Sequence, residues 1–163
     1  MDHVGMLALM VWVFAEKQKD IKMEKILKMA LCHELASVKT GDLIFLSGKL
    51  PKDSNGDLIK GKLGVDLTVD EGYEAARYCG IAQLATLKAE IGDLNKVVRI
   101  VKVTGMINSD PYFTDQSKVV NGFSDLMVEV FGERGKHARA AVGMVSLPLG
   151  AACEIEMIVE VTQ

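Results

Sequence analysis

The chain has 163 residues, of which 49% are hydrophobic and 25% are charged, a balance that suits one domain with a sizeable core. Its net charge of −3 argues against nucleic-acid binding, which needs a clustered basic surface. The three cysteines form no CxxC pair, so the sequence indicates neither a zinc site nor a disulfide framework, and reduced thiols suit a cytoplasmic protein.

The first 35 residues differ in composition from the rest of the chain. Val4–Ala15 is a continuous apolar run, shorter than the about 20 residues that span a membrane. Asp2 and His3 precede it, where a secretory signal would have basic residues. We therefore expect residues 1–35 to form a helical leader that packs on protein and does not enter a membrane. A signal peptide and a misassigned start codon are the alternatives.

The main domain is expected over residues 36–163. A buried strand is predicted at Asp42–Gly48, and Asn55-Gly56 then predicts a tight turn with a two-stranded ribbon around it. Thr68, with a glutamate three residues later, forms a capping box for a helix that Gly92 ends.

The second half of the domain continues the alternation of strands and helices. A strand is predicted at Lys96–Asn108 and a helix at Ser117–Gly132, and two strands close the chain. The link between them, Pro148–Cys153, is too short for a parallel crossover, so they should run antiparallel. The order β-β-(β)-α-β-α-β-β fits an α+β fold, a single sheet with two helices on one face. Apolar residues on its other face predict an oligomer.

The last two strands carry the candidate functional residues. Arg139 is followed by small residues, and its planar guanidinium can bind a carboxylate bidentately; a surface or intersubunit salt bridge is the alternative. Glu154 and Glu156 share one side of the last strand, where a solvated face is the alternative. His137 is expected to be solvated. The sequence has no nucleophile motif, phosphate loop or metal-spaced histidine pair.

Three segments together resemble the RidA/YjgF family of reactive-intermediate deaminases. They are Ser47-Gly48 with Pro51 after a buried strand, the segment HARAAVGMVSLP, and the Glu-Ile-Glu that begins at Glu154. VNGFSDLMVEVFGE and GKHARAAVGMVSLPLGAA further resemble a subgroup labelled chorismate-mutase-like or L-PSP endoribonuclease. The resemblance covers roughly residues 34–161 and implies a chorismate-mutase-like single mixed sheet with two helices on one face. It also implies a trimer whose sheets pack into a central barrel.

The resemblance implies an activity and a set of site residues. Members of the family hydrolyse 2-imino acids to 2-keto acids and ammonia in clefts between subunits, without a metal or organic cofactor. Arg139 would hold the substrate carboxylate, and Glu154 would position the attacking water. The other residues implied to bind substrate are Ser47, Gly48, Asn121, Ser124 and Ala141.

Two other functions stay open on the sequence. One is a non-enzymatic, regulatory trimer that binds small carboxylates in the same arginine cleft. The other is the endoribonuclease or translation-inhibitor activity of the family's older label, against which the acidic balance counts. The expected partners are therefore small 2-imino or 2-keto acids and further copies of the chain, with neither a membrane nor nucleic acid.

The closing strands also predict a site shared between subunits. If they pair as a hairpin about Pro148–Cys153, Glu154 faces the neighbourhood of Ser146, roughly 20 Å or more from Arg139. We therefore expect Arg139 of one subunit to work with Glu154 of its neighbour, or the two residues to belong to different sites.

Overall fold

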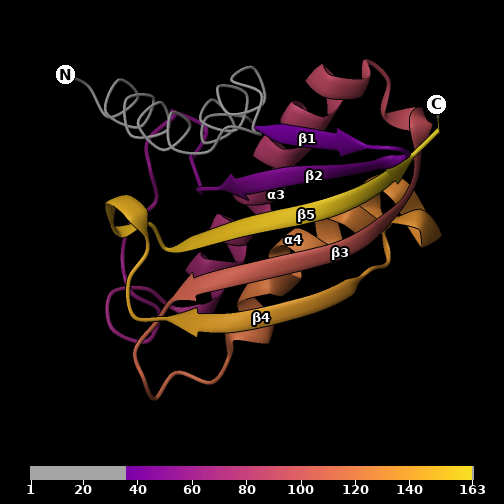
Figure 1. Cartoon of the computed structure of the whole chain (residues 1–163). Coiled ribbons are helices and arrows are strands. Elements are labelled where there is room, and N and C mark those ends of the chain that lie inside the picture. The colour runs from indigo at the N-terminus through magenta and orange to yellow at the C-terminus, as the bar shows by residue number, and fades with distance from the viewer. Residues whose placement is uncertain (1–35, 163) are drawn as a thin grey trace, which may run out of the picture. The chain divides into compact units, whose positions relative to one another are not determined.

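The computed structural model describes residues 36–162, and the predicted leader lies outside them. The described part is one mixed sheet with two long helices on one face, which confirms the predicted α+β architecture (Figure 1). The strands are β1 (Ser37–Thr40), β2 (Leu43–Lys49), β3 (Val97–Asn108), β4 (Ala138–Met144) and β5 (Cys153–Val161). The helices are α3 (Val69–Ile91) and α4 (Gln116–Phe131). Within this part of the chain, no helix is long and apolar enough to cross a membrane.

The sheet has the strand order β1-β2-β5-β3-β4. Only β3 and β4 pair in parallel, and every other neighbouring pair is antiparallel. The two closing strands, β4 and β5, run in opposite directions as predicted, but they do not form a hairpin because β3 lies between them. The hairpin interpretation is therefore wrong, since the link after β4 crosses the end of β3 before β5 begins.

Two local predictions in the first half of the domain also need correction. A strand that the sequence pattern did not indicate, β1, pairs with β2 through a turn at Gly41, whose φ is +59°. The predicted ribbon around Asn55-Gly56 is reduced to one isolated bridge between Lys52 and Leu58. Asp53 explains the missing ribbon, because its carboxylate accepts hydrogen bonds from the backbone N–H groups of residues 55 and 57, at 2.8 and 2.9 Å. These local bonds replace a strand ladder.

Helix α3 begins and ends where the sequence predicts. The Thr68 side chain accepts from the backbone N–H of Glu71, whose carboxylate accepts from the N–H of Thr68, and the C-cap is Gly92. Close packing against α4 depends on Gly122, where an added Cβ would overlap the backbone carbonyl of Tyr73. The helices and the sheet then enclose a core that includes Ile44, Leu87, Ile100, Val103, Ile107, Phe123, Met127, Ile155 and Met157.

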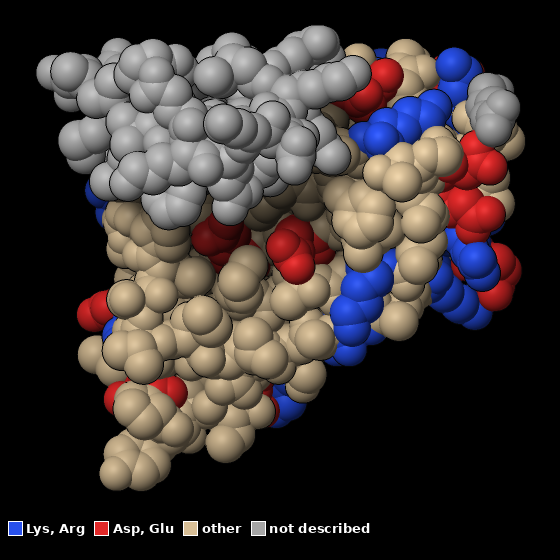
Figure 2. Space-filling model, in the orientation of Figure 1, with Lys and Arg blue, Asp and Glu red and all other residues tan. Residues whose placement is uncertain are grey.

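We call the side of the sheet that packs against α3 and α4 the helix face and the opposite side the strand face. Alternation along each strand puts Ile44 and Leu46 on the helix face and Phe45 on the strand face. The strand face carries exposed apolar side chains, among them Phe45 and Val142 at 43% and 42% exposure. Acidic side chains gather at the middle of this face over β5 (Figure 2). A surface of this kind is typical of an association site.

Candidate functional site

Arg139 projects from β4 onto the helix face, beneath α4. It lies opposite Val103 of β3, which is fully buried under the helices, and paired residues of neighbouring strands point to the same face. Its Nη1 donates to Asn121 Oδ1 at 2.8 Å and to Ser124 Oγ at 3.1 Å, and its Nη2 donates to the carbonyl of Ser117 at 3.3 Å. Three groups from one face of α4 therefore orient the guanidinium.

The guanidinium of Arg139 has capacity left for a ligand. Of the five N–H donors of an arginine, three are directed at α4, which leaves Nε–H and one Nη2–H. Among the described residues Arg139 makes no ion pair, unlike Arg77 and Arg99, which pair with Glu129 and Glu160. The structure thus shows an oriented cation whose charge no described carboxylate neutralises, and two donors suffice for a bidentate carboxylate.

His137 extends this cluster. We expected it to be solvated, and that prediction is wrong. It is half-buried, with Nδ1 2.6 Å from the carbonyl oxygen of Gly135 and Nε2 3.0 Å from Ser124 Oγ. Burial lowers the pKa of His137, and the charge of Arg139 also lowers it, which outweighs the opposing effect of the hydrogen bond to Gly135 and favours the neutral ring. A shallow pocket of about 250 Å³ lies beside the cluster, lined by Ser124, Val128, Lys136, His137 and Arg139.

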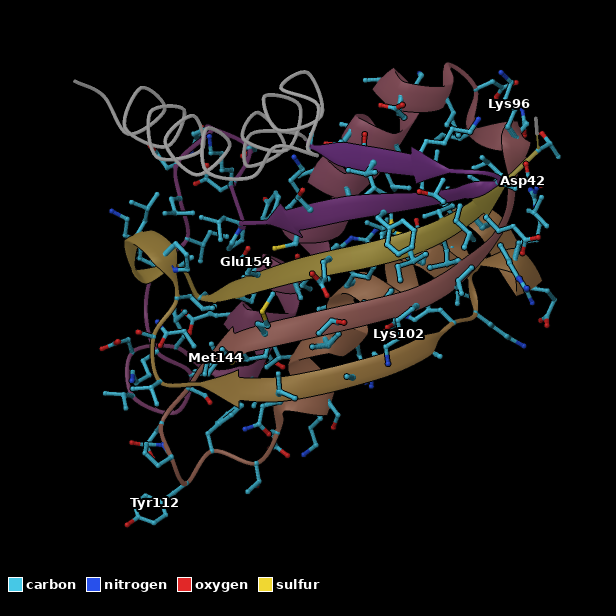
Figure 3. All side chains as sticks on the ribbon, in the orientation of Figure 1. Asp42, Lys96, Lys102, Tyr112, Met144 and Glu154 are labelled. Carbon is cyan, nitrogen blue, oxygen red and sulfur yellow. The ribbon has the colours of Figure 1, made fainter. Side chains whose placement is uncertain are left out.

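Glu154 lies on the strand face near the start of β5 (Figure 3). It is opposite Met106 of β3, between the buried residues Cys153 and Ile155. Its side chain lies directly over Gly48 of β2, where an added Cβ atom would overlap Glu154 Oε1 and displace the carboxylate from this position. Burial raises the pKa of Glu154, and the neighbouring charge of Glu156 adds to that rise.

A buried glutamine on α3 holds the backbone around Glu154. Gln83 is fully buried, and its Nε2 donates to the carbonyls of Ser47 at 2.8 Å and Ile155 at 2.7 Å. The ladder between β2 and β5 is irregular at this point, so the amide supplies donors that the strands themselves do not. Sequence reasoning missed Gln83, although an uncharged polar residue on the inward side of an amphipathic helix is a weak signal for such a role.

The candidate residues therefore separate into two groups on opposite faces of the sheet. Arg139, Asn121 and Ser124 lie together on the helix face, whereas Glu154 lies with Gly48 on the strand face. Ser47 is an exposed residue of β2 beside Gly48, and Ala141 is half-buried against the core on the helix face.

The separation of Arg139 and Glu154 in one chain is shorter than predicted. The register places Glu154 three residues along the strands from Arg139 and two strands across, about 10 Å in each direction. The predicted distance of roughly 20 Å is wrong because it assumed a hairpin. The sheet itself still lies between the two side chains, so one chain does not bring them to one ligand.

The described residues hold no group of three or more His, Cys, Asp or Glu side chains placed to bind a metal ion. The thiols of Cys79 and Cys153 lie 3.6 Å apart in the core, and burial raises the pKa of Cys79 well above its usual range. Both side chains belong to the hydrophobic core beneath the start of β5.

Comparison with known proteins agrees with this fold. The family described as "YjgF/chorismate_mutase-like, putative endoribonuclease" matches residues 23–161. The chain belongs to this family. It is 48% identical over 124 residues to Protein TCP17 of Trypanosoma cruzi, a match that covers 76% of this chain and 78% of that protein.

Two solved structures extend the comparison. The protein Atu1372 of Agrobacterium tumefaciens superposes with a TM-score of 0.77 at 43% identity, covering 79% of this chain and 83% of that one. RidA of an Antarctic Psychrobacter bacterium superposes with a TM-score of 0.54 at 26% identity, covering 77% of this chain and 86% of that one.

Replacing Glu154 by glutamine should raise the melting temperature at pH 7. Because the pKa of Glu154 is raised in the folded chain, ionising this residue costs more in the folded than in the unfolded state. The natural protein therefore loses stability relative to Glu154→Gln as the pH rises through the unfolded and then the folded pKa. Below both pKa values the side chain is neutral in each state, and the two proteins should melt together.

Thermal unfolding of both proteins at pH 3.5 and pH 7 tests this. Glu160→Gln is a control on the same strand, because Glu160 accepts from Arg99 at 2.6 Å and its replacement removes an ion pair. A Glu154→Gln protein that melts below the natural one at pH 7 would show that the carboxylate stabilises the fold.

Proposed function

We propose that this protein hydrolyses small 2-imino acids to 2-keto acids and ammonia, in clefts formed between copies of the chain in a trimer. The observation that carries the proposal is the state of Arg139. Its guanidinium is oriented by Ser117, Asn121 and Ser124, has no acidic partner among the described residues, and keeps two donors for a carboxylate. An arginine that served only to stabilise the fold would gain more from a carboxylate partner than from a carbonyl and two uncharged side chains.

The reaction needs few protein groups. With the carboxylate of a 2-imino acid on Arg139, the adjacent C=N carbon is held for attack by water. Glu154 accepts a proton from that water as its oxygen bonds to the carbon, and then donates it to nitrogen. The hydroxyl proton of the resulting carbinolamine then moves to nitrogen by way of Glu154, and the C–N bond breaks as the C=O bond of the 2-keto acid forms and ammonia leaves. The raised pKa of Glu154 favours both proton transfers, because a general base and acid works best when its pKa lies nearer the working pH.

The separation of the two groups requires a second copy of the chain. Arg139 lies on β4, the edge strand of the sheet, where another subunit can approach without breaking a described strand pair. The exposed apolar residues of the strand face supply a surface for that approach, and Glu154 stands on the same face. Each cleft would then combine Arg139 and the α4 residues of one subunit with Glu154, Ser47 and Gly48 of the next.

The similarity to RidA supports a deaminase, and the charge of the chain counts against the endoribonuclease alternative. One solved neighbour is RidA, and the resemblance found in the sequence implies that members of that family are deaminases. The family description also includes endoribonuclease, which fits poorly with a net charge of −3. A protein that only binds carboxylates would share the Arg139 cluster but would not require Glu154.

Arg139→Ala should abolish ammonia release, and Arg139→Lys should restore little of it. A lysine keeps the charge but loses the planar fork that binds Asn121, Ser124 and a carboxylate together, so we expect a loss of about 100-fold or more in kcat/KM. Ammonia release from an imino acid freshly generated by an amino-acid oxidase gives the measurement. Arg99→Ala is the matched control, because that arginine pairs with Glu160 and should leave the rate unchanged. A lysine variant as active as the parent contradicts the anchoring role.

Mixed trimers test whether the site is shared. Arg139→Ala and Glu154→Ala chains, each inactive alone, should regain activity after they are unfolded and reassembled together. If each site takes Arg139 from one subunit and Glu154 from its neighbour, about a quarter of the sites in randomly assembled trimers contain both natural residues. Mass spectrometry verifies that mixed trimers formed. No recovery in such trimers would mean that the two residues serve different sites or act within one chain.

A further inference from the structure

The cluster around Arg139 contains a histidine whose hydrogen bonds have a defined direction. The carbonyl of Gly135 can only accept, so His137 Nδ1 carries the proton of their 2.6 Å contact. In the neutral ring the other nitrogen, Nε2, then has a lone pair and no proton. The 3.0 Å contact between Nε2 and Ser124 Oγ is therefore a hydrogen bond that the hydroxyl donates.

This direction determines what Ser124 offers to Arg139. A hydroxyl has one proton, and here His137 accepts it, so the lone pairs of Ser124 Oγ remain for the guanidinium. Arginine has no acceptor, and its Nη1 donates to that oxygen at 3.1 Å. The result is a chain of hydrogen bonds from Arg139 to Ser124, to His137 and to the backbone carbonyl of Gly135.

We propose that His137 is a positioning residue that orients the carboxylate-binding guanidinium of Arg139 through the hydroxyl of Ser124. The proposal rests on the function proposed for Arg139 and adds a residue to that site. His137 and Arg139 are two residues apart in the sequence, and the side chains of both reach α4. One short segment therefore supplies both residues that bind Ser124.

The alternative fate of the Ser124 hydroxyl explains why the histidine matters. A serine in the middle of a helix that lacks another acceptor donates to the carbonyl four residues earlier, which for Ser124 is that of Val120. That rotation turns Oγ away from Arg139. The guanidinium then keeps Asn121 and Ser117 but loses one of its three bonds, and its remaining donors shift relative to the ligand.

If the His137 ring serves only to pack, the effects of replacing it will follow a different order. The His137 ring packs edge-on against Phe123, with centroids 6.5 Å apart and planes at 83°. If this packing is what the protein needs, a phenylalanine at position 137 will serve and an open-chain amide will not. If the lone pair of Nε2 is needed, the order reverses.

The experiment compares His137→Phe with His137→Gln. The phenylalanine keeps a ring without nitrogen atoms, and the glutamine places an amide oxygen near the position of Nε2. We expect His137→Phe to bind pyruvate about tenfold more weakly, the loss expected when one hydrogen bond to a charged group is weakened. We expect His137→Gln to bind within about threefold of the natural protein, and Lys118→Gln, an exposed change on α4, to bind unchanged.

Kinetics of ammonia release give a second readout. A misplaced carboxylate anchor weakens the bound substrate and the transition state together, so KM in the phenylalanine variant should rise by the same factor as the dissociation constant, with kcat nearly unchanged. A phenylalanine variant that binds pyruvate like the natural protein overturns the proposal. So does a glutamine variant that binds as weakly as the phenylalanine one.

Crystal structures of the two variants separate this inference from the proposed function. The contact between Arg139 Nη1 and Ser124 Oγ should persist in the glutamine variant and be lost in the phenylalanine variant, whether or not either protein turns over imino acids. If the natural protein releases no ammonia but the contact follows this pattern, the proposed activity fails and the positioning role stands. If the contact persists in both variants, the positioning role is wrong.

Discussion

Three hydrogen bonds from Arg139 to α4 join the edge of the sheet to the helix layer, and the candidate site is arranged around them. These bonds depend on how closely α4 packs against α3 and how closely the turn after α4 packs against α4 itself. Gly122 lets α4 lie directly against the backbone of α3, and Gly135 lets the chain after α4 fold back against the backbone of Met127, because a Cβ at either glycine would overlap a carbonyl group. That turn leads into β4 beside β3 and places Arg139 under the polar side of α4.

The sheet imposes a second constraint, because it separates Arg139 from Glu154. The carboxylate lies on the strand face over Gly48 of β2, and the buried amide of Gln83 binds the neighbouring backbone carbonyls of Ser47 and Ile155. Its raised pKa shows that this placement is unfavourable for the ionised form in the single chain. A group kept at such a cost is typical of a functional site, and the proposed function gives it a partner on the neighbouring subunit.

The sequence predicted the ends of helix α3, because their causes are local. The capping box at Thr68 and the stop at Gly92 are read directly from neighbouring residues, and the structure places the helix ends there. The strand order was not predictable in this way, because the insertion of β3 between β4 and β5 depends on contacts between distant segments. The predicted hairpin failed for that reason.

The site was predicted in part for a similar reason. Arg139 and Glu154 are visible as charged residues within apolar strands. Gln83 and His137 are not, because each is held by backbone carbonyls, those of Ser47, Ile155 and Gly135, which no side-chain pattern encodes. Their roles follow only once the fold brings these segments together.

The proposed site places a carboxylate ligand between Arg139 of one copy of the chain and Glu154 of another. A crystal structure of the full chain grown with pyruvate tests it most directly. We expect the ligand carboxylate about 3 Å from Nε and Nη2 of Arg139, with the keto carbon of pyruvate facing Glu154 of a neighbouring subunit. Pyruvate bound away from Arg139, or held by residues of a single subunit alone, would contradict it.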